Sequence, residues 1–146
     1  MIHLIGQTKK KIQTDFTGRK TRIGVVGTIP AMNSNLYDFG EENNNITKII
    51  PNAKDQQFIH DMILISTPVT IPYVNEDFVA FLRSWGKKES LDALVLGCTD
   101  LPTLLGHRDG MVELFKKEFG FQVYDPVEVL IETCAKYITL APNIHA

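Results

Sequence analysis

The chain has 146 residues and is 44% hydrophobic, which is enough for one core of ordinary domain size and leaves little for a second. Its 15 lysines and arginines and 17 aspartates and glutamates give a net charge of -2, which argues against binding to nucleic acid or to an anionic membrane. Two cysteines are too few for a secreted disulfide scaffold, and no apolar stretch is long enough for a signal peptide or a membrane span. We therefore expect one domain over residues 1–146, with free thiols, in the reducing cytoplasm.

The first elements predicted along the chain are an amphipathic helix and a buried strand. Ile5, Ile12 and Phe16 recur at near-helical spacing around three lysines, so we expect an opening helix within residues 1–18. Residues 23–26 form a short apolar run that Gly27 closes. Such a run is typical of a strand that is buried on both faces of a parallel sheet.

Helices and strands then alternate. After the first strand, we predict a helix that carries Met32, Leu36 and Tyr37 and ends at Gly40, and then a strand over 46–50. A helix from Asp55 follows. The next helix is capped by Asn75 and ends at Gly86, and it leads to a strand over 93–96. A brief helix then opens at Thr99, Asp100 and Pro102 and closes at Gly106, and a further helix with Met111 and Phe115 ends at Gly120.

The last elements are a fourth strand and a final helix. Residues 121–124 form the strand, and Asp125, Pro126 and Glu128 are typical of the cap, first residue and capping-box acid of a helix over 126–140. Strands that alternate with helices predict a parallel sheet with right-handed crossovers. The expected fold class is α/β: a three-layer Rossmann-like lobe with a four-stranded parallel sheet, flanked by N-terminal and C-terminal helices.

The polar residues best placed for chemistry follow two of the predicted strands. Thr28 comes after the first strand, and Cys98, Thr99 and Asp100 come after the third. In a parallel sheet, ligands bind beyond the carboxyl ends of the strands, where helix starts expose unpaired N–H groups. Those groups favour a thiolate at Cys98, which could act as a nucleophile or a proton acceptor, whereas most free cysteines are simply small buried hydrophobes. Asp100 is expected to cap the next helix and to lie at the pocket rim.

Other residue types offer weaker candidates. Cys134 lies inside the final helix, where packing is its expected role. His3, His60, His107 and His145 show no ligand spacing with each other or with the cysteines, so we expect no metal site, and we expect His60 at the surface or its boundary. The chain has neither a Walker lysine loop nor a Gly-x-Gly-x-x-Gly run, and we expect no bound cofactor.

Four segments, in order, resemble the aspartate/glutamate racemase superfamily. Residues 96–102 read Leu-Gly-Cys-Thr-Asp-Leu-Pro and are similar to that family's second catalytic-cysteine motif, Gly-Cys-Thr-Glu-Leu/Ile-Pro. The other three segments resemble its Gly-Thr loop and following helix, its Pro-x-x-x-Asp-Gln-x-x-Ile stretch, and the strand that leads to its last helix: residues 23–37, 51–60 and 123–125. The resemblance makes residues 20–125 a racemase-like lobe, with flanking helices in residues 1–18 and 126–140.

The sequence also departs from the family's pattern. A family member has a preceding lobe with its own cysteine, and nothing before Gly27 here could supply it. Leu130 replaces the histidine of the family's Asp-Thr-x-x-x-His, and Ala31 stands where a second hydroxyl is common. Pro68 and Pro72 replace a charged helix end and its lysine, which weakens the case for binding a substrate carboxylate.

The resemblance implies a cofactor-independent amino-acid racemase, an isomerase in which a thiol and a thiolate on two facing lobes remove and return the α-proton. Cys98 would be catalytic, and Thr28, Thr99 and Asp100 would bind the substrate, an amino acid or a dicarboxylate. The second thiol would come from a complementary lobe or from a second copy in a homodimer. The alternative is a catalytically inactive racemase-like half that binds a small carboxylate or serves as an interaction module.

Overall fold

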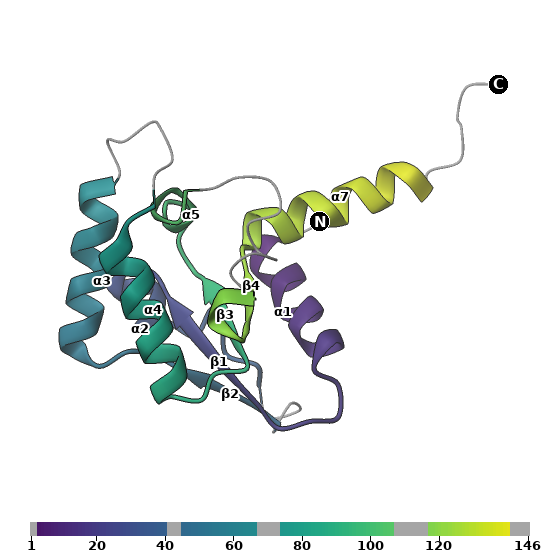
Figure 1. The fold of residues 1–146 in the computed structure, drawn as a ribbon. Coiled ribbons are helices and arrows are strands. Elements are labelled where there is room, and N and C mark those ends of the chain that lie inside the picture. Colours follow the sequence, from purple (N-terminus) through teal and green to yellow (C-terminus); the bar gives the residue numbers. More distant parts are fainter. Residues whose placement is uncertain (1–2, 41–44, 67–73, 107–116, 141–146) are drawn as a thin grey trace.

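A computed structural model of the chain describes residues 3–40, 45–66, 74–106 and 117–140, and Figure 1 shows the fold. Four parallel strands form one sheet in the order β2-β1-β3-β4. Their bounds are Thr21–Val26 for β1, Ile46–Ile49 for β2, Ala93–Leu96 for β3 and Gln122–Tyr124 for β4. The predicted fold class, an α/β lobe with a four-stranded parallel sheet, is confirmed.

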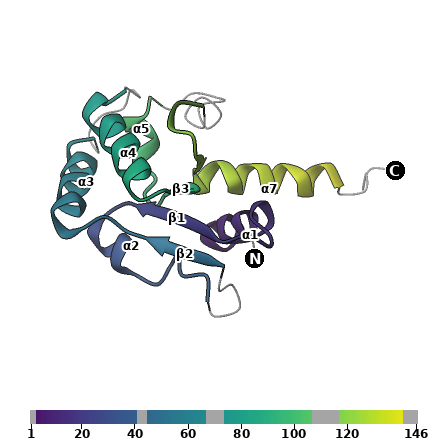
Figure 2. The same ribbon diagram turned by 60° about the horizontal axis from the view of Figure 1, so that its bottom comes forward.

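Helices cover both faces of this sheet (Figure 2). Their bounds are Leu4–Asp15 for α1, Ile29–Asn33 for α2, Ala53–Ser66 for α3, Glu76–Lys88 for α4, Leu101–Leu104 for α5 and Pro126–Leu140 for α7. Helices α3, α4 and α5 lie on one face, whereas α1 and α7 lie together on the other, and α7 projects beyond the sheet. None of the helices in the described part of the chain is long and apolar enough to cross a membrane.

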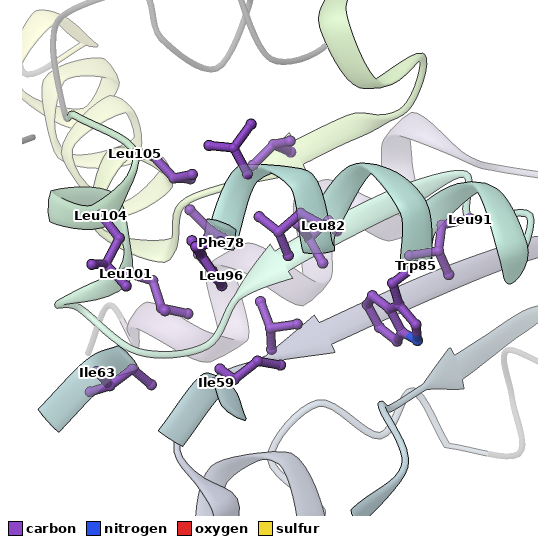
Figure 3. Close-up of a cluster of buried hydrophobic side chains, with 14 of the residues drawn as sticks. Ile59, Ile63, Phe78, Leu82, Trp85, Leu91, Leu96, Leu101, Leu104 and Leu105 are labelled. Carbon is purple, nitrogen blue, oxygen red and sulfur yellow. The ribbon is translucent and has the colours of Figure 1, made fainter. Parts of the chain in front are cut away.

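The core forms two apolar layers because successive strand residues point to opposite faces. In β3, Leu94 and Leu96 join the layer under α3, α4 and α5, whereas Ala93 and Val95 join the layer under α1 and α7. Figure 3 shows the first layer, in which Leu82 of α4 is fully buried with neighbours from α3 and α5. This arrangement gives three layers: helices, sheet and helices.

The opening helix α1 packs against the final helix α7. Ile12 of α1 is fully buried in one cluster with Val129 of α7. At the end of α1, the hydroxyl of Tyr124 on β4 donates to the Asp15 carboxylate at 2.6 Å. The two flanking helices therefore pack on each other and on the sheet.

Two predicted helix ends are wrong. The helix after Thr28 stops at Asn33 and does not reach Gly40, because Ser34 is extended and its side chain bonds to backbone groups nearby. Helix α4 does not stop at Gly86 but continues to Lys88. A Cβ on Gly86 would lie 2.2 Å from the Phe121 ring, so this glycine makes room for that ring rather than ending the helix. Met111, Phe115, Pro68 and Pro72 lie outside the described residues.

Candidate functional site

The carboxyl ends of β1 and β3 lie side by side in the middle of the sheet. The two strands pair in parallel, with Val26 opposite Leu96, so the segments that follow them leave the sheet together. The chain runs from β1 outward to β2 and then returns to place β3 on the other side of β1. Such a reversal of strand order opens a crevice at the carboxyl edge, where α/β proteins bind ligands.

Gly97 lets these two segments approach each other closely. Its backbone N–H donates to the carbonyl oxygen of Val26 at 2.6 Å. A Cβ at this position would lie 2.9 Å from the same oxygen, which is closer than two such atoms can pack. Glycine at this position therefore brings Cys98 close to the Gly27-Thr28 turn.

Cys98 is half-buried, and its thiol environment differs from the one predicted. Burial raises the pKa of the Cys98 thiol above its ordinary value, and the Asp100 carboxylate adds to the rise. Hydrogen bonds from the backbone N–H groups of Asp100 and Leu101 lower the pKa but do not outweigh burial. The predicted preference for a thiolate is therefore wrong: the protonated thiol is the favoured form at neutral pH.

A small cavity lies directly beside Cys98. Its volume is about 30 Å³, and its polar lining consists of Tyr37, Cys98, Thr99 and Asp125. Leu4 at the start of α1 contributes to its apolar side. A cavity of this size holds about one water molecule, whereas ligand pockets usually measure about 300–1,000 Å³. The described residues alone thus do not enclose an amino acid at the thiol.

Thr28 lies at the same edge of the sheet but is not among the residues that line this cavity. It is the N-cap of α2, and its hydroxyl accepts a hydrogen bond from the Ala31 N–H at 3.4 Å. The next backbone N–H, that of Ile29, donates to Nδ1 of His60 on α3 at 3.5 Å. His60 therefore contacts the turn at the carboxyl edge of β1, a role that its place on an amphipathic helix did not reveal.

Thr99 and Asp100 occupy the turn between β3 and α5. Thr99 is exposed and lines the cavity, whereas Asp100 is half-buried and does not line it. The predicted capping role of Asp100 is wrong, because its backbone is helical at the N-cap position and its side chain makes no capping hydrogen bond. Its carboxylate instead contributes to the raised pKa of the Cys98 thiol.

Sequence reasoning missed two residues of the cavity wall. Tyr37 was assigned to a longer helix, and Asp125 only to the cap of the last helix. Asp125 does cap α7, because its Oδ1 accepts from the Val127 N–H at 3.0 Å, yet it is buried beside Cys98 as well. Since Asp125 follows β4, the strand next to β3, its place at the sheet's carboxyl edge was the available signal.

The remaining candidates lie apart from this cavity. Cys134 is half-buried on α7 and does not line it, and both cysteines are unpaired. Among the residues with a described placement, no group of three histidine, cysteine, aspartate or glutamate side chains could hold a metal ion. His107 and His145 lie outside those residues.

Comparisons with known proteins agree with the resemblance found in the sequence. The sequence model of the family described as Asp/Glu/Hydantoin racemase matches residues 1–134. An aspartate racemase homologue from Pyrococcus horikoshii OT3 is similar in structure, with a TM-score of 0.70 and 19% identity over 95% of this chain. A predicted Asp/Glu racemase from Yersinia pestis gives a TM-score of 0.67 and 21% identity over 94% of the chain. The chain spans 56% and 55% of the lengths of these two proteins. A search of the curated proteins found no match.

Proposed function

Because the chain belongs to the Asp/Glu/Hydantoin racemase family, we propose that it is the Cys98-bearing lobe of an isomerase that inverts the α-carbon of an amino acid. The observation that carries the proposal is the position of Cys98. Its thiol follows the central strand β3, at the point where the strand order reverses, beside the turn that follows β1. No bound cofactor is needed for this chemistry, because a thiol and a thiolate can pass a proton between themselves and the α-carbon.

The raised pKa of Cys98 defines its role in the proposed reaction. A protonated thiol donates a proton and does not remove one, so Cys98 returns the α-proton to the carbanion while a second base removes it from the other face. In the reverse direction, Cys98 starts as the thiolate. Because burial and the Asp100 carboxylate oppose the thiolate, this direction needs a positive group supplied by the partner.

The substrate carboxylate is proposed to lie between the two turns that follow β1 and β3. Thr99 is exposed there, and Thr28 marks the other turn. Hydroxyl and backbone N–H groups suit a carboxylate, which accepts hydrogen bonds from both. Asp100, at the rim beside them, is suited to an amino group, because its negative charge opposes a second carboxylate. The substrate class is therefore an amino acid, and the description of the family, Asp/Glu/Hydantoin racemase, makes aspartate and glutamate the first two to assay.

A partner is proposed to close the site and to supply the second acid or base. The cavity at Cys98 is too small for an amino acid, and the chain spans little more than half of its solved relatives. Either a complementary lobe or a second copy of this chain fits this requirement. With two unpaired cysteines, one of them reactive in the proposal, a reducing compartment such as the cytoplasm is the proposed location.

The second candidate function is a non-catalytic module that binds a small carboxylate. Two observations favour it: the small volume beside Cys98 and Leu130 in place of the family's histidine. Losing one positioned proton-transfer group typically costs about 10²-fold to 10⁴-fold in rate, so a half-site would be slow. Binding of L-aspartate or L-glutamate without exchange of the α-hydrogen would identify this module.

The test of the proposed function is exchange of the substrate's α-hydrogen with solvent. The purified chain is incubated with L-aspartate or L-glutamate in deuterated water, and loss of the α-proton signal is followed by NMR. The assay is repeated over a range of protein concentrations, because a site built from two copies gives a rate that rises faster than linearly. Loss of the α-proton supports the proposal, and absence of exchange with both amino acids at every concentration counts against it.

A further inference from the structure

Two buried polar side chains beside Cys98 have hydrogen-bonding capacity that the described residues do not use. Tyr37 is 3% exposed and Asp125 is 5% exposed. In the part of the chain that the structure describes, the Tyr37 hydroxyl makes no hydrogen bond, and the Asp125 carboxylate accepts only one, from Val127 to Oδ1. No fully buried side-chain nitrogen or oxygen among those residues lacks a partner, so the Tyr37 hydroxyl and Asp125 Oδ2 must reach open space.

The open space that both residues share is the cavity at Cys98. Tyr37, Asp125 and Cys98 all line it, from three separate segments of the chain. Its volume of about 30 Å³ exceeds the volume of about 10–15 Å³ that a cavity needs to hold a water molecule. A buried water needs two to four polar partners, and a hydroxyl, a carboxylate oxygen and a thiol supply three.

We propose that this cavity holds one water molecule, bound by Tyr37 and Asp125, which passes the proton of the Cys98 thiol to Asp125. Asp125 is thus a positioning residue that acts on Cys98 through water. The binding of water stands on the geometry alone, whereas the use of the proton path in turnover rests on the proposed function. The path lies between the sheet edge and α7, so the thiol exchanges its proton without passing it through the substrate.

The proton step balances in atoms and charge. The S–H bond of Cys98 breaks as its proton joins the water oxygen, and one O–H bond of that water breaks as its proton joins Asp125 Oδ2. The water is restored, and one negative charge moves from the carboxylate to the sulfur. Ionising Cys98 without this transfer would instead leave two negative charges around one cavity, which is costly in a poorly solvated site.

The charged and titratable groups that face Cys98 come from three directions. Asp100 lies on the α5 side, Asp125 precedes α7, and Tyr37 follows α2. On the α1 side the lining residue is Leu4, which is apolar. The burial of Tyr37 and the nearby Asp125 carboxylate raise the pKa of that tyrosine to about 12, so its hydroxyl stays protonated and can donate to the water.

The test measures how the alkylation of Cys98 by iodoacetamide depends on pH, in a Cys134→Ser background so that one thiol reports. Asp125→Asn removes the charge but keeps the helix cap, since asparagine caps as well as aspartate. We expect the midpoint to move to lower pH and the rate at neutral pH to rise about tenfold or more, because one negative charge is removed across a single water. An unchanged midpoint would overturn the proposal.

Two further variants make the result specific. Asp15→Asn removes another carboxylate that faces a buried tyrosine, Tyr124, away from the cavity, and it should leave the alkylation profile unchanged. Asp100→Asn should also lower the midpoint. The size of its shift shows how much a carboxylate that acts directly on the thiol contributes, and the shift with Asp125→Asn is compared with it. A shift with Asp15→Asn as large as that with Asp125→Asn would show a general charge effect and overturn the specific role of Asp125.

Direct detection of the water keeps the proposal testable if Asp125→Asn does not fold. Contacts between water and the Val127 methyl groups, measured by NMR on the unmodified chain, should show a bound molecule, and their absence would overturn the hydration site. Neither measurement uses a substrate. If α-hydrogen exchange fails, the alkylation profile and the NMR contacts with water can therefore still be measured. The proposed function and this inference can fail separately.

Discussion

The backbone nitrogen of Gly97 lies 2.6 Å from the carbonyl oxygen of Val26, and a Cβ on Gly97 would lie 2.9 Å from that oxygen. This contact joins the ends of the two central strands and fixes the distance between the turns that follow them. Cys98 comes next in the chain, so the position of its thiol depends on a residue without a side chain. The spacing between the two turns is thus set by one hydrogen bond and by the absence of a side chain on Gly97.

Gly97→Ala should destabilise the fold and weaken the reaction at Cys98. The added methyl group meets backbone, which cannot turn aside as a flexible side chain can, so we expect a loss of about 1–3 kcal/mol. Urea unfolding measures this loss. The matched control is Gly6→Ala in α1, where the nearest atom to a new Cβ is 3.7 Å away, and this change should be neutral or stabilising by about 0.5–1 kcal/mol. Equal effects at the two positions would contradict the steric account.

Gly86→Ala should destabilise the protein although alanine is the better helix former. Alanine gains about 1 kcal/mol of helix propensity over glycine, but the new Cβ would lie 2.2 Å from the Phe121 ring. We expect a net loss of about 1–3 kcal/mol in the free energy of unfolding. In the double variant with Phe121→Leu, the cost of the alanine should shrink, because the smaller side chain leaves room. A cost that is the same in both backgrounds would rule out the ring contact as its cause.

How well the sequence predicted the fold depends on the range of the interactions. Asn75 was predicted to cap α4 from its place before two acidic residues, and its side chain does accept from the Phe78 N–H at 3.0 Å. The third strand was predicted at its observed bounds, since an apolar run between turn residues is a local signal. Gly86 was misassigned because the ring that requires it comes from Phe121, 35 residues further along the chain.

In the site, too, local features could be predicted from the sequence and long-range ones could not. The motif around Cys98 could be identified, because its residues are continuous in sequence. The pKa of the thiol was not readable, since burial by distant segments outweighs the local N–H groups that the sequence reveals. Tyr37 and Asp125 reach the cavity through the packing of α7 on the sheet, and no local pattern marks that packing.

Stability should fall steeply in alkaline solution because of two buried tyrosines. Burial, with a smaller contribution from Asp125, raises the pKa of Tyr37 to about 12, and burial and Asp15 raise that of Tyr124 further still. Unfolded tyrosines ionise near pH 10, so above about pH 10 the folded chain binds more protons than the unfolded chain. Below about pH 9, the contribution of these tyrosines to the free energy of unfolding should not change with pH. Above about pH 10, that free energy should fall by up to about 1.4 kcal/mol per pH unit for each tyrosine.

Tyr37→Phe should make that alkaline slope shallower. Urea unfolding at pH values between about 8 and 11 measures the slope directly. The control is Tyr137→Phe, because the Tyr137 side chain is 61% exposed in the folded chain, so its replacement should leave the slope unchanged. If both variants keep the slope of the unmodified chain, Tyr37 does not contribute to it.

The exposed apolar side chains of α7 should mediate association with the proposed partner. Ile131 is 62% exposed and Ile138 is 77% exposed, and both lie on the helix whose first residues border the Cys98 cavity. Replacing both with glutamate should weaken association, measured by light scattering of the chain alone and after addition of a complementary lobe. Thermal unfolding of the variant should change little, since these side chains are already in water. Association that survives the double replacement would move the contact surface elsewhere.

The most direct test of the account compares α-hydrogen exchange in two cysteine variants under identical conditions. Cys98→Ala should abolish the uptake of solvent deuterium at the α-carbon of L-aspartate or L-glutamate. Cys134→Ala, a change on α7 away from the cavity, should retain it. Exchange that persists in Cys98→Ala at the rate of the unmodified chain would contradict the assignment of this thiol as the acid of the reaction.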